Sequence, residues 1–535
     1  MSYSKTNATA ATFTKNRTAG SVSPFSGMCA TCIEGCTGLC EVGKSALRGS
    51  EVIYPAPYGT MTAASEKDYP IDYSHFNIMG TAVGAHGIES DSDKAIFPNV
   101  NIETEFGYKD KIKLKVPWFI PGLGSTNVAK INWDGLAIGS AISGSMLVIG
   151  ENVVGMDPKS EFKNGRVVKA PDLAERVKLF QDWYDGYGTI VVQANVEDTR
   201  LGTLEYAISE LGVDTVELKW GQGAKDIGGE VKIDNLEKAL MLKSRGYVVL
   251  PDPEDPKIQA AFKAGVFTEF ERHSRVGMVD EEDFMRRVEE LRSLGAKHVF
   301  LKTGAYRPAD LARAVKFASQ ARIDLLTVDG AGGGTGMSPW RMMNEWGVPT
   351  VYLQSLLYEY LQRIEKAGAY VPDVAIAGGF TLEDAVFKGL ALSAPYTKAV
   401  GMGRGPLAAA MVGKTVGKLA AEGKLPRDLA KYGSDYENLF AGATELKAKY
   451  GSDFKYIPAG AIAVYTYYSR IAQGLKQLMC GARKFALKYI DRGDLASLTR
   501  EAAELTGIPF VTELDALEVD EILSSVPRAE EELAD

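Results

Sequence analysis

Short apolar, β-branched runs alternate with amphipathic segments from about residue 111 onward, and Gly-rich turns close most of the runs. Short apolar runs bounded by turn residues predict strands, whereas apolar residues three and four positions apart predict helices. The predicted strands are Lys115–Ile120, Met146–Ile149, Gly188–Ala194, Thr215–Lys219, His298–Lys302, Leu325–Val328, Val374–Ala377 and Ala399–Met402. The predicted helices between them include Thr203–Leu211, Glu281–Leu294, Pro308–Ala321, Thr350–Ala367 and Leu382–Ser393.

Eight strands, most of them followed by a helix over roughly 300 residues, are the pattern of a (β/α)8 TIM barrel. A doubly wound parallel sheet is the alternative, and it would carry a G-x-G-x-x-G turn early in the chain. The stretch Gly122-Leu123-Gly124 is instead followed by Ser125, Thr126 and Asn127. The sequence therefore favours an α/β barrel.

The predicted barrel occupies residues 111–425. An N-terminal arm with a cysteine-rich segment precedes it over residues 1–50, and a connecting arm covers residues 51–110. A helical extension follows over residues 426–535, with its main helix predicted at Ala461–Arg492. We therefore expect additional segments both before and after the barrel in the sequence.

Composition narrows the class of protein. The chain has 535 residues, 45% of them hydrophobic, which is enough for a large core and more than one unit. Its net charge of −9 and pI near 5.4 argue against a nucleic-acid surface, because phosphate contacts need clustered Lys and Arg. The longest weakly charged stretch, Gly135–Gly150, is broken by Gly and Ser, and it predicts a buried helix and strand rather than a membrane span. We expect a cytoplasmic enzyme.

Four of the five cysteines fall within twelve residues, at Cys29, Cys32, Cys36 and Cys40, with the spacing C-x2-C-x3-C-x3-C. Four thiolates on one short loop are typical of a [4Fe–4S] cluster. Structural zinc is the alternative, although zinc sites normally use two C-x2-C knuckles separated by a longer insert. Disulfides fit less well, because such close spacings strain the bridge geometry. We expect a protein that transfers electrons singly.

Glycine-containing turns follow the last two predicted strands, with Gly378 and Gly379 after the seventh strand and Gly401, Gly403 and Arg404 after the eighth. Backbone N–H groups in such turns can approach an anion closely, and this is where TIM barrels commonly bind phosphate. Arg404 could add a charge-assisted contact. Beside an iron–sulfur cluster, FMN is the simplest phosphate-bearing cofactor.

Further candidate residues lie at the ends of the other strands. The sixth strand ends at Asp329 and leads into a run that contains Gly332, Gly333 and Gly334, against which a flat ring could lie. Lys302 ends the fifth strand, where its cation could stabilise negative charge on reduced flavin. The remaining predicted cofactor-binding residues are Gly122 and Gln193.

Several of these segments resemble one known family. Gly221-Gln222-Gly223-Ala224-Lys225, Leu301-Lys302 and the Val328–Pro339 loop are similar to stretches of the FMN-binding synthase domain of glutamate synthase, as are Gly150-Glu151 and the run Gly474–Phe485. The resemblance implies a TIM barrel that binds FMN, with Lys302 near the flavin and Lys225 among the catalytic residues. It also implies that reduced FMN delivers a hydride to 2-iminoglutarate, formed from 2-oxoglutarate and ammonia, to give L-glutamate.

The departures from this family are also informative. The sequence starts Met1-Ser2, and too few residues precede the barrel for a glutaminase domain with an N-terminal cysteine nucleophile. Only Cys480 lies beyond residue 402, so the family's usual [3Fe–4S] ligand set is not expected, and the segment Cys29–Cys40 instead resembles that of the short, archaeal-type members. Arg341 follows the sixth strand, where it could bind a substrate carboxylate or simply lie on the helix surface.

The expected electron route runs from an external carrier to the cluster, then to FMN and then to the substrate. The carrier would be a ferredoxin or an NAD(P)H-oxidising partner subunit. We expect the protein to be an oligomer that binds a 2-oxo acid or amino acid. Two alternatives keep the fold. One is a glutamate synthase-like subunit of a larger complex with amino-group or methylamine–glutamate chemistry, and the other is a pure flavin and iron–sulfur electron-transfer subunit.

Overall fold

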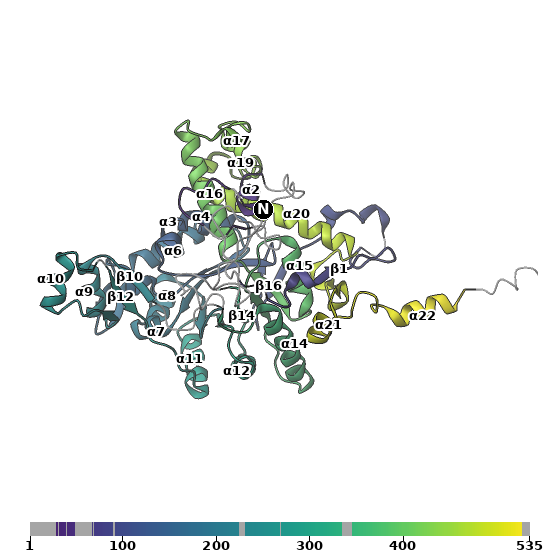
Figure 1. Ribbon diagram of the computed structural model, residues 1–535, viewed down its shortest axis with the longest axis horizontal. Coiled ribbons are helices and arrows are strands. Elements are labelled where there is room, and N and C mark those ends of the chain that lie inside the picture. The colour runs from purple at the N-terminus through teal and green to yellow at the C-terminus, as the bar shows by residue number, and fades with distance from the viewer. Residues whose placement is uncertain are drawn as a thin grey trace, which may run out of the picture.

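A closed barrel of eight parallel strands forms the centre of the protein (Figure 1). The computed structural model describes residues 28–29, 32–38, 40–48, 67, 69–88, 91–223, 230–267, 269–333 and 345–526. The barrel strands are β4 (Trp118–Leu123), β5 (Met146–Ile149), β8 (Ile190–Ala194), β9 (Thr215–Lys219), β13 (His298–Thr303), β14 (Leu325–Asp329), β15 (Val374–Ala377) and β16 (Thr397–Gly401). The prediction of a (β/α)8 barrel is confirmed.

Helices follow the strands and cover the outside of the barrel. They are α3 (Asn127–Ile131), α4 (Trp133–Ile142), α5 (Val153–Met156), α6 (Pro171–Gln181), α7 (Val196–Leu201), α8 (Thr203–Leu211), α11 (Glu281–Ser293), α12 (Pro308–Gln320), α14 (Thr350–Lys366), α15 (Glu383–Leu392) and α16 (Arg404–Ala421). A small hairpin of β6 (Glu161–Lys163) and β7 (Arg166–Lys169) lies between α5 and α6. The predicted helix and strand of Gly135–Gly150 correspond to parts of α4 and β5.

Most predicted elements agree with the structure to within two residues, and two differ by more. The first strand was expected at Lys115–Ile120 but begins at Trp118, because Pro117 lacks an N–H group and Lys115 donates its own N–H to Gly144 outside the barrel. The C-terminal helix was expected at Ala461–Arg492, whereas α20 spans Ala459–Gly481. The helix ends where Arg483 adopts a left-handed conformation (φ 57°).

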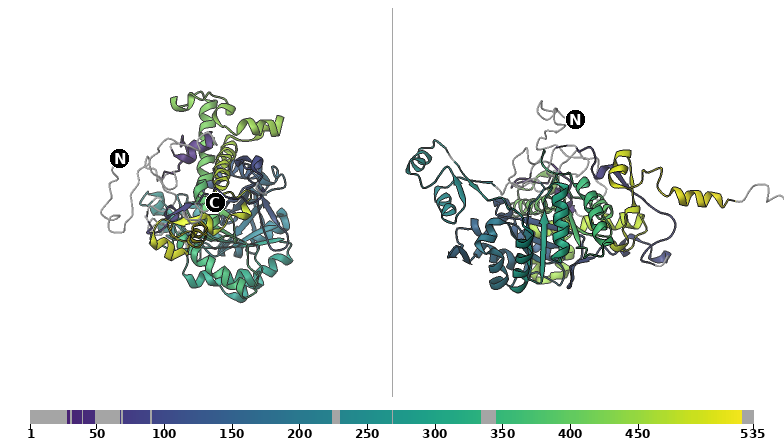
Figure 2. Two further views of the ribbon diagram at one scale, coloured as in Figure 1. Left: turned by 90° about the vertical axis from the view of Figure 1, so that its right-hand side faces the viewer. Right: turned by 90° about the horizontal axis from the view of Figure 1, so that it is seen from below.

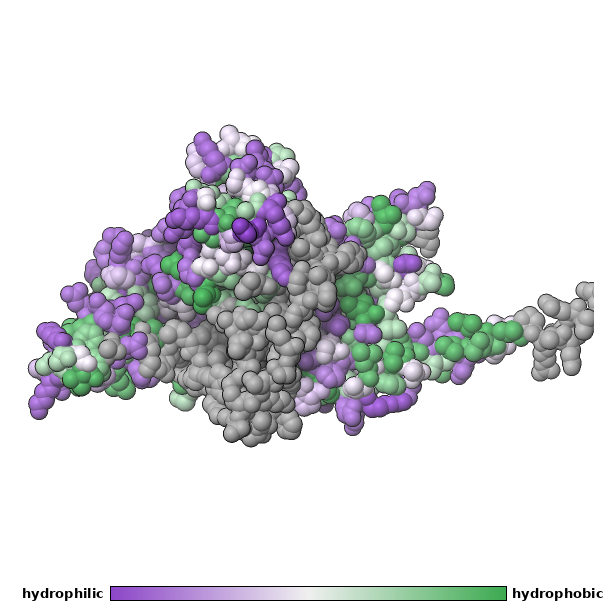
Figure 3. Space-filling view, turned by 45° about the horizontal axis from the view of Figure 1, so that its top comes forward, coloured by the Kyte–Doolittle hydropathy of each residue, from purple (hydrophilic) through white to green (hydrophobic). Residues whose placement is uncertain are grey.

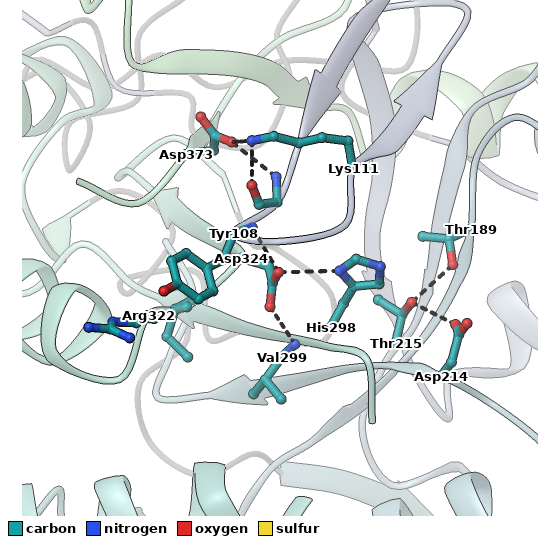
Figure 4. Close-up of polar contacts among 12 residues, drawn as sticks. Tyr108, Lys111, Thr189, Asp214, Thr215, His298, Val299, Arg322, Asp324 and Asp373 are labelled. Carbon is teal, nitrogen blue, oxygen red and sulfur yellow. Dashed lines mark hydrogen bonds and ion pairs between the residues drawn. The ribbon is translucent and has the colours of Figure 1, made fainter. Parts of the chain in front are cut away.

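A hairpin closes the bottom of the barrel, at the N-terminal ends of the strands (Figure 4). It is formed by β2 (Thr104–Phe106) and β3 (Ile112–Leu114), and Phe106 packs edge-on against Phe300 inside the barrel. Asp324 accepts hydrogen bonds from the backbone N–H groups of Tyr108 at 2.9 Å and Val299 at 3.0 Å, and it lies 3.2 Å from the His298 ring. One buried carboxylate therefore fastens the hairpin to the barrel.

An insertion between β9 and α11 was not predicted. It contains a three-stranded antiparallel sheet and two helices, β10 (Glu230–Ile233), α9 (Leu236–Ser244), β11 (Val248–Leu250), α10 (Pro256–Lys263) and β12 (Phe270–His273). It has a small core of its own, in which Leu242 and Phe270 are fully buried, and it projects from one side of the barrel (Figures 1 and 2). Among the described residues of the barrel and its helices, only Met156 on α5 joins that core.

Helix α2 (Glu41–Arg48), which follows the four cysteines, packs against α16 and α20 (Figure 1). The connecting arm contains β1 (Phe76–Ile78), which pairs with β17 (Leu495–Ser497) near the other terminus. The remaining C-terminal helices are α17 (Arg427–Ala430), α18 (Tyr436–Leu439), α19 (Ala443–Tyr450), α21 (Arg500–Thr506) and α22 (Ala516–Ser524). The N-terminal α2 therefore packs on α16 and α20, whereas β1, β17 and α21 pack on α15 and α14.

Helix α22 projects away from the rest of the protein and carries exposed hydrophobic residues such as Leu517 and Leu523 (Figures 1 and 3). Across the described ranges, no helix combines the length and the apolar character that crossing a membrane requires.

We expect Asp324→Ala to lower the free energy of unfolding by about 3 kcal/mol, because it leaves one buried and one half-buried backbone N–H group, and His298, without their acceptor. Denaturant unfolding followed by tryptophan fluorescence would measure this loss. Asp214→Ala is the control, since Asp214 lies at the same end of the barrel with a 44% exposed side chain (Figure 4), and its loss should stay within about 0.5 kcal/mol. Equal losses for the two variants would contradict the role given to Asp324.

Candidate active site

Alternation along the strands places polar side chains at the mouth of the barrel, the C-terminal end of the strands. Phe300 belongs to the inner core, so Lys302, two residues further along β13, points to the same side. The register pairs Phe300 with Glu217 and Glu217 with Gln193, which continues this inner layer onto β9 and β8. Gln193, Glu217 and Lys302 are all buried there.

Lys302 forms a buried ion pair across two strands. Its Nζ lies 3.2 Å from Oδ2 of Asp329, and each side chain is only 4% exposed. Burial alone would lower the pKa of Lys302, but the charges of Asp329 and Glu217 outweigh it and hold that pKa above its ordinary value. Lys302 is therefore a fixed cation at the mouth of the barrel.

A second charged group links two loops at the mouth. Lys219 Nζ lies 2.7 Å from Oε1 of Glu151 and donates to Oε1 of Gln222 at 2.7 Å. Burial alone would raise the pKa of Glu151, but the charge and hydrogen bond of Lys219 lower it to about 2. Glu151 is thus a permanent carboxylate, and Lys219 ties its loop to the Gly221–Gly223 turn.

Gln193 has an open hydrogen-bonding position. Its Nε2 donates to Oε1 of Glu217 at 2.5 Å, while its buried Oε1 has no hydrogen-bond partner within the described residues. A Cβ on Gly122 would lie 2.6 Å from that Oε1, so the glycine leaves room for the amide. A buried acceptor of this kind suits an N–H group of a planar ligand.

The loops that follow β9, β14 and β15 pack tightly together. A Cβ on Gly223 would lie 2.2 Å from the carbonyl oxygen of Gly330, and one on Gly333 would lie 2.6 Å from Cα of Gly378. Thr350 Oγ1 donates to the carbonyl oxygen of Gly378 at 2.8 Å. Glycine is required here because two backbones approach each other closely, and the result is a flat wall of main-chain atoms.

Two glycines leave open space beside the last two strands. Gly379 has a φ of +110°, and no atom of the described residues lies within 4 Å of a Cβ added to Gly379 or Gly403. Gly403 also caps the N-terminus of α16. Gly401 ends β16, and Gly332 lies beside Gly378, so the predicted glycines surround one rim of the mouth. The arrangement suits a phosphate.

Arg404 lies beside that rim but is directed toward the N-terminal cysteines. Its Nη2 donates to the carbonyl oxygen of Cys29 at 3.1 Å and lies 4.0 Å from Sγ of Cys32. The sequence predicted a phosphate contact for Arg404, whereas the structure brings it to the cysteine segment. Lys225, Gly334 and Arg341, also predicted as site residues, lie outside the described residues.

The four cysteines lie near one another without disulfide bonds. Hydrogen bonding to Cys29 and burial raise the pKa of the Cys40 thiol, while burial raises that of Cys32 against the opposing charge of Arg404. The backbone N–H groups of Gly38 and Gly43 point to the Cys36 and Cys40 sulfurs at 3.4 and 3.5 Å. This donor set suits a cluster chemically. In the described parts of the chain, however, no three His, Cys, Asp or Glu side chains are arranged to hold a metal ion.

Arg272 is a buried cation that sequence reasoning missed. It lies on β12 of the insertion, is 1% exposed, and stacks 5.0 Å from the Tyr247 ring. Burial lowers its pKa, although the acidic side chains of Glu151 and Glu197 oppose that effect. Its Nε and Nη1 have no hydrogen-bond partner among the residues the structure describes. No sequence signal marked Arg272, because only the folded insertion brings it toward the barrel.

Asp198, also missed, supports the loop that carries Glu151. Its Oδ2 accepts the backbone N–H of Asn152 at 2.8 Å, and its Oδ1 accepts the hydroxyl of Thr203 at 3.2 Å. Tyr247 of the insertion donates to the Asn152 side chain at 3.3 Å. Burial, despite these hydrogen bonds, raises the pKa of Asp198 to about 7.

Comparison with known families identifies one conserved segment. Residues 272–414 match the family model described as the conserved region in glutamate synthase. The match runs from Arg272 on β12 into α16, so it includes Lys302, Asp329 and the glycine loops. The resemblance inferred from sequence motifs is therefore confirmed over this part of the chain. A comparison with curated proteins gave no match.

Solved structures match the chain at low identity. A flavocytochrome b2 variant with benzoylformate is 13% identical, with 84% of this chain and 81% of that chain covered and a TM-score of 0.43. A soluble mutant of the membrane-associated (S)-mandelate dehydrogenase from Pseudomonas putida is 14% identical, with 79% and 88% covered and a TM-score of 0.40. The barrel assignment rests on the strand pairing of this chain itself.

We expect the wild-type protein to lose stability relative to Asp198→Asn as pH rises from about 4 to about 7. A carboxyl group with a raised pKa binds its proton more tightly in the folded state, so the folded state is favoured at low pH and loses that advantage as the proton leaves. Because the pKa of Asp198 is raised from 3.8 to about 7 by folding, the free energy of unfolding can change by at most about 4 kcal/mol over this pH range.

Free energies of unfolding measured across this pH range would test the expectation. Asp234→Asn is the control, because Asp234 is exposed on the insertion and its curve should follow the wild type. Parallel curves for the wild type and Asp198→Asn would contradict the raised pKa.

Proposed function

The chain carries the conserved region of the glutamate synthase family over residues 272–414, and from that premise we propose that it is an FMN-dependent oxidoreductase that reduces a 2-imino acid to an amino acid. The substrate we propose is 2-iminoglutarate, formed from 2-oxoglutarate and ammonia with loss of water. Two electrons and two protons convert this imine to glutamate. The observation that carries the proposal is the family match over the half of the barrel that contains Lys302 and the glycine loops.

The residues at the mouth fit FMN. The open Oε1 of Gln193 would accept an N–H group of the flavin ring, and Lys302 would lie against the part of the ring that becomes negative on reduction. The turns at Gly378–Gly379 and Gly401–Gly403 would bind the phosphate through their backbone N–H groups. When bound, FMN would supply the hydride.

Arg272 would bind a carboxylate of the substrate. An unpaired buried guanidinium is costly, and a carboxylate can satisfy two of its N–H groups at once. The Glu151 carboxylate, which pairs with Lys219, interacts electrostatically with Arg272, so Arg272 belongs to the group of charges at the mouth. Lys302 and Asp329 are buried away from water, so solvent screens their interaction with a bound ligand only weakly.

We also propose that Cys29, Cys32, Cys36 and Cys40 bind a [4Fe–4S] cluster, which the chemistry of four neighbouring thiols supports. A ferredoxin or an NAD(P)H-oxidising partner subunit would reduce it one electron at a time. We place the enzyme in the cytoplasm as part of an oligomer.

The test of the proposed function is anaerobic flavin reoxidation. Protein isolated without oxygen should be yellow, and after reduction with dithionite its flavin should reoxidise when 2-oxoglutarate and ammonium are added together, with glutamate as the product. Either compound alone serves as the control. A flavin that stays reduced with both present would favour the electron-transfer alternative, and a colourless preparation would end the proposal.

We expect Arg272→Gln to raise the KM for 2-oxoglutarate about 100-fold, because a charged hydrogen-bonded contact contributes about 2–3 kcal/mol. Steady-state kinetics at saturating ammonium would measure this change. In thermal unfolding without substrate, the variant should lose no more than about 2 kcal/mol, from the stacking on Tyr247, since Nε and Nη1 have no hydrogen-bond partner in the described structure.

Arg275→Gln is the matched control. Arg275 also follows the insertion sheet, but its side chain is 40% exposed and already paired with Glu197 at 3.0 Å, so the KM should change less than threefold. If both variants left the KM unchanged, or if Arg272→Gln unfolded the protein without affecting the KM, Arg272 would be a structural residue.

A further inference from the structure

Arg404 joins two parts of the protein that lie far apart in the sequence. It is the first residue of α16, directly after the Gly401–Gly403 turn. Its Nη2 donates to the Cys29 carbonyl oxygen at 3.1 Å and lies 4.0 Å from Cys32 Sγ. The guanidinium is therefore within contact distance of one of the four sulfurs.

The cysteine segment has other attachments to the same helix. A Cβ on Gly38 would lie 3.3 Å from Val412 Cγ1, and α2 packs along α16 and α20. Lys414 Nζ lies 3.8 Å from Oε1 of Glu34, and both of those side chains are more than 40% exposed. These contacts fix the position of the segment, but they bring no charge to a sulfur. Arg404 does so, and its half-buried position reduces screening by solvent.

The charge has a direct electrochemical consequence. A cluster gains negative charge on reduction, so a fixed cation and an N–H group directed at a cysteine sulfur stabilise the reduced form. We propose that Arg404 is a positioning residue that raises the reduction potential of the cluster held by the four cysteines. This inference rests on the proposed cluster. It goes beyond that proposal because it assigns control of the reduction potential to a residue of α16, outside the cysteine segment.

A role of Arg404 at the cluster differs from a role in binding the FMN phosphate. Among the described residues, the space beside Gly379 and Gly403 is open to an anion, while the Arg404 side chain is directed to Cys29 and Cys32. Loss of the guanidinium should therefore change the cluster potential and leave FMN affinity unchanged. A phosphate-binding arginine would give the opposite result.

The experiment is a redox titration of the whole protein followed by the EPR signal of the reduced cluster. In a solution poised at the wild-type midpoint, Arg404→Gln should lower the ratio of reduced to oxidised cluster about tenfold, equivalent to about 59 mV. Arg404→Lys, which keeps the charge, should restore most of the wild-type ratio. Lys414→Gln is the matched control on the same helix, and its ratio should change less than threefold.

A second variant keeps the test valid if Arg404→Gln fails to assemble the cluster. Arg404→Met keeps a long apolar side chain but carries no charge, so its potential should fall as in Arg404→Gln, while that of Lys414→Met should not. A purely structural role for Arg404 would produce no such difference.

Three results would overturn the inference. An unchanged potential in Arg404→Gln would do so, and so would weakened FMN binding with an unchanged potential, which would assign Arg404 to the phosphate. A wild-type protein that contains FMN but no iron would end both this inference and the proposed cluster, while leaving the flavin chemistry at the barrel mouth intact.

Discussion

Every second side chain of a barrel strand points inward, and in a closed barrel these side chains share one narrow interior. At the bottom of this barrel the inward positions are apolar, with Phe106 of the hairpin packed against Phe300. At the mouth, the same alternation directs the polar side chains of Gln193, Glu217 and Lys302 inward, and all three are buried. The same geometric constraint therefore produces a stable, dry end and a polar, reactive end.

The polar end depends on charges that compensate one another out of water. Lys302 pairs with Asp329, and Lys219 pairs with Glu151, so each buried cation has a nearby carboxylate. Removing one member of such a pair would leave an unpaired buried charge, which costs several kcal/mol. Arg272 is different, because two of its nitrogens have no hydrogen-bond partner in the described structure. Acidic side chains also act on Arg272, but its two nitrogens without a hydrogen-bond partner leave a place where an anionic ligand could bind.

Local patterns predicted most of the barrel, because the residues of each segment favour the secondary structure that the segment adopts. Thr215–Lys219, Val374–Ala377 and Thr203–Leu211 have the predicted bounds, since each is a short apolar or amphipathic run closed by a turn. The predictions failed where distant contacts decide the structure. Helix α20 ends early because the chain turns to hydrogen-bond with His86, and the insertion forms around a core of its own that no local pattern marked.

The sequence by itself determined the barrel, the four neighbouring thiols, the glycine turns and the lysine at the end of the fifth strand, because spacing and periodicity act over a few residues. Only the tertiary structure decided which of these groups meet. It brought Arg404 to Cys32, Lys219 to Glu151, and Arg272 of the insertion toward the acidic residues at the mouth. Such contacts join residues tens or hundreds of positions apart, and they follow from packing and charge compensation that no short stretch of sequence contains.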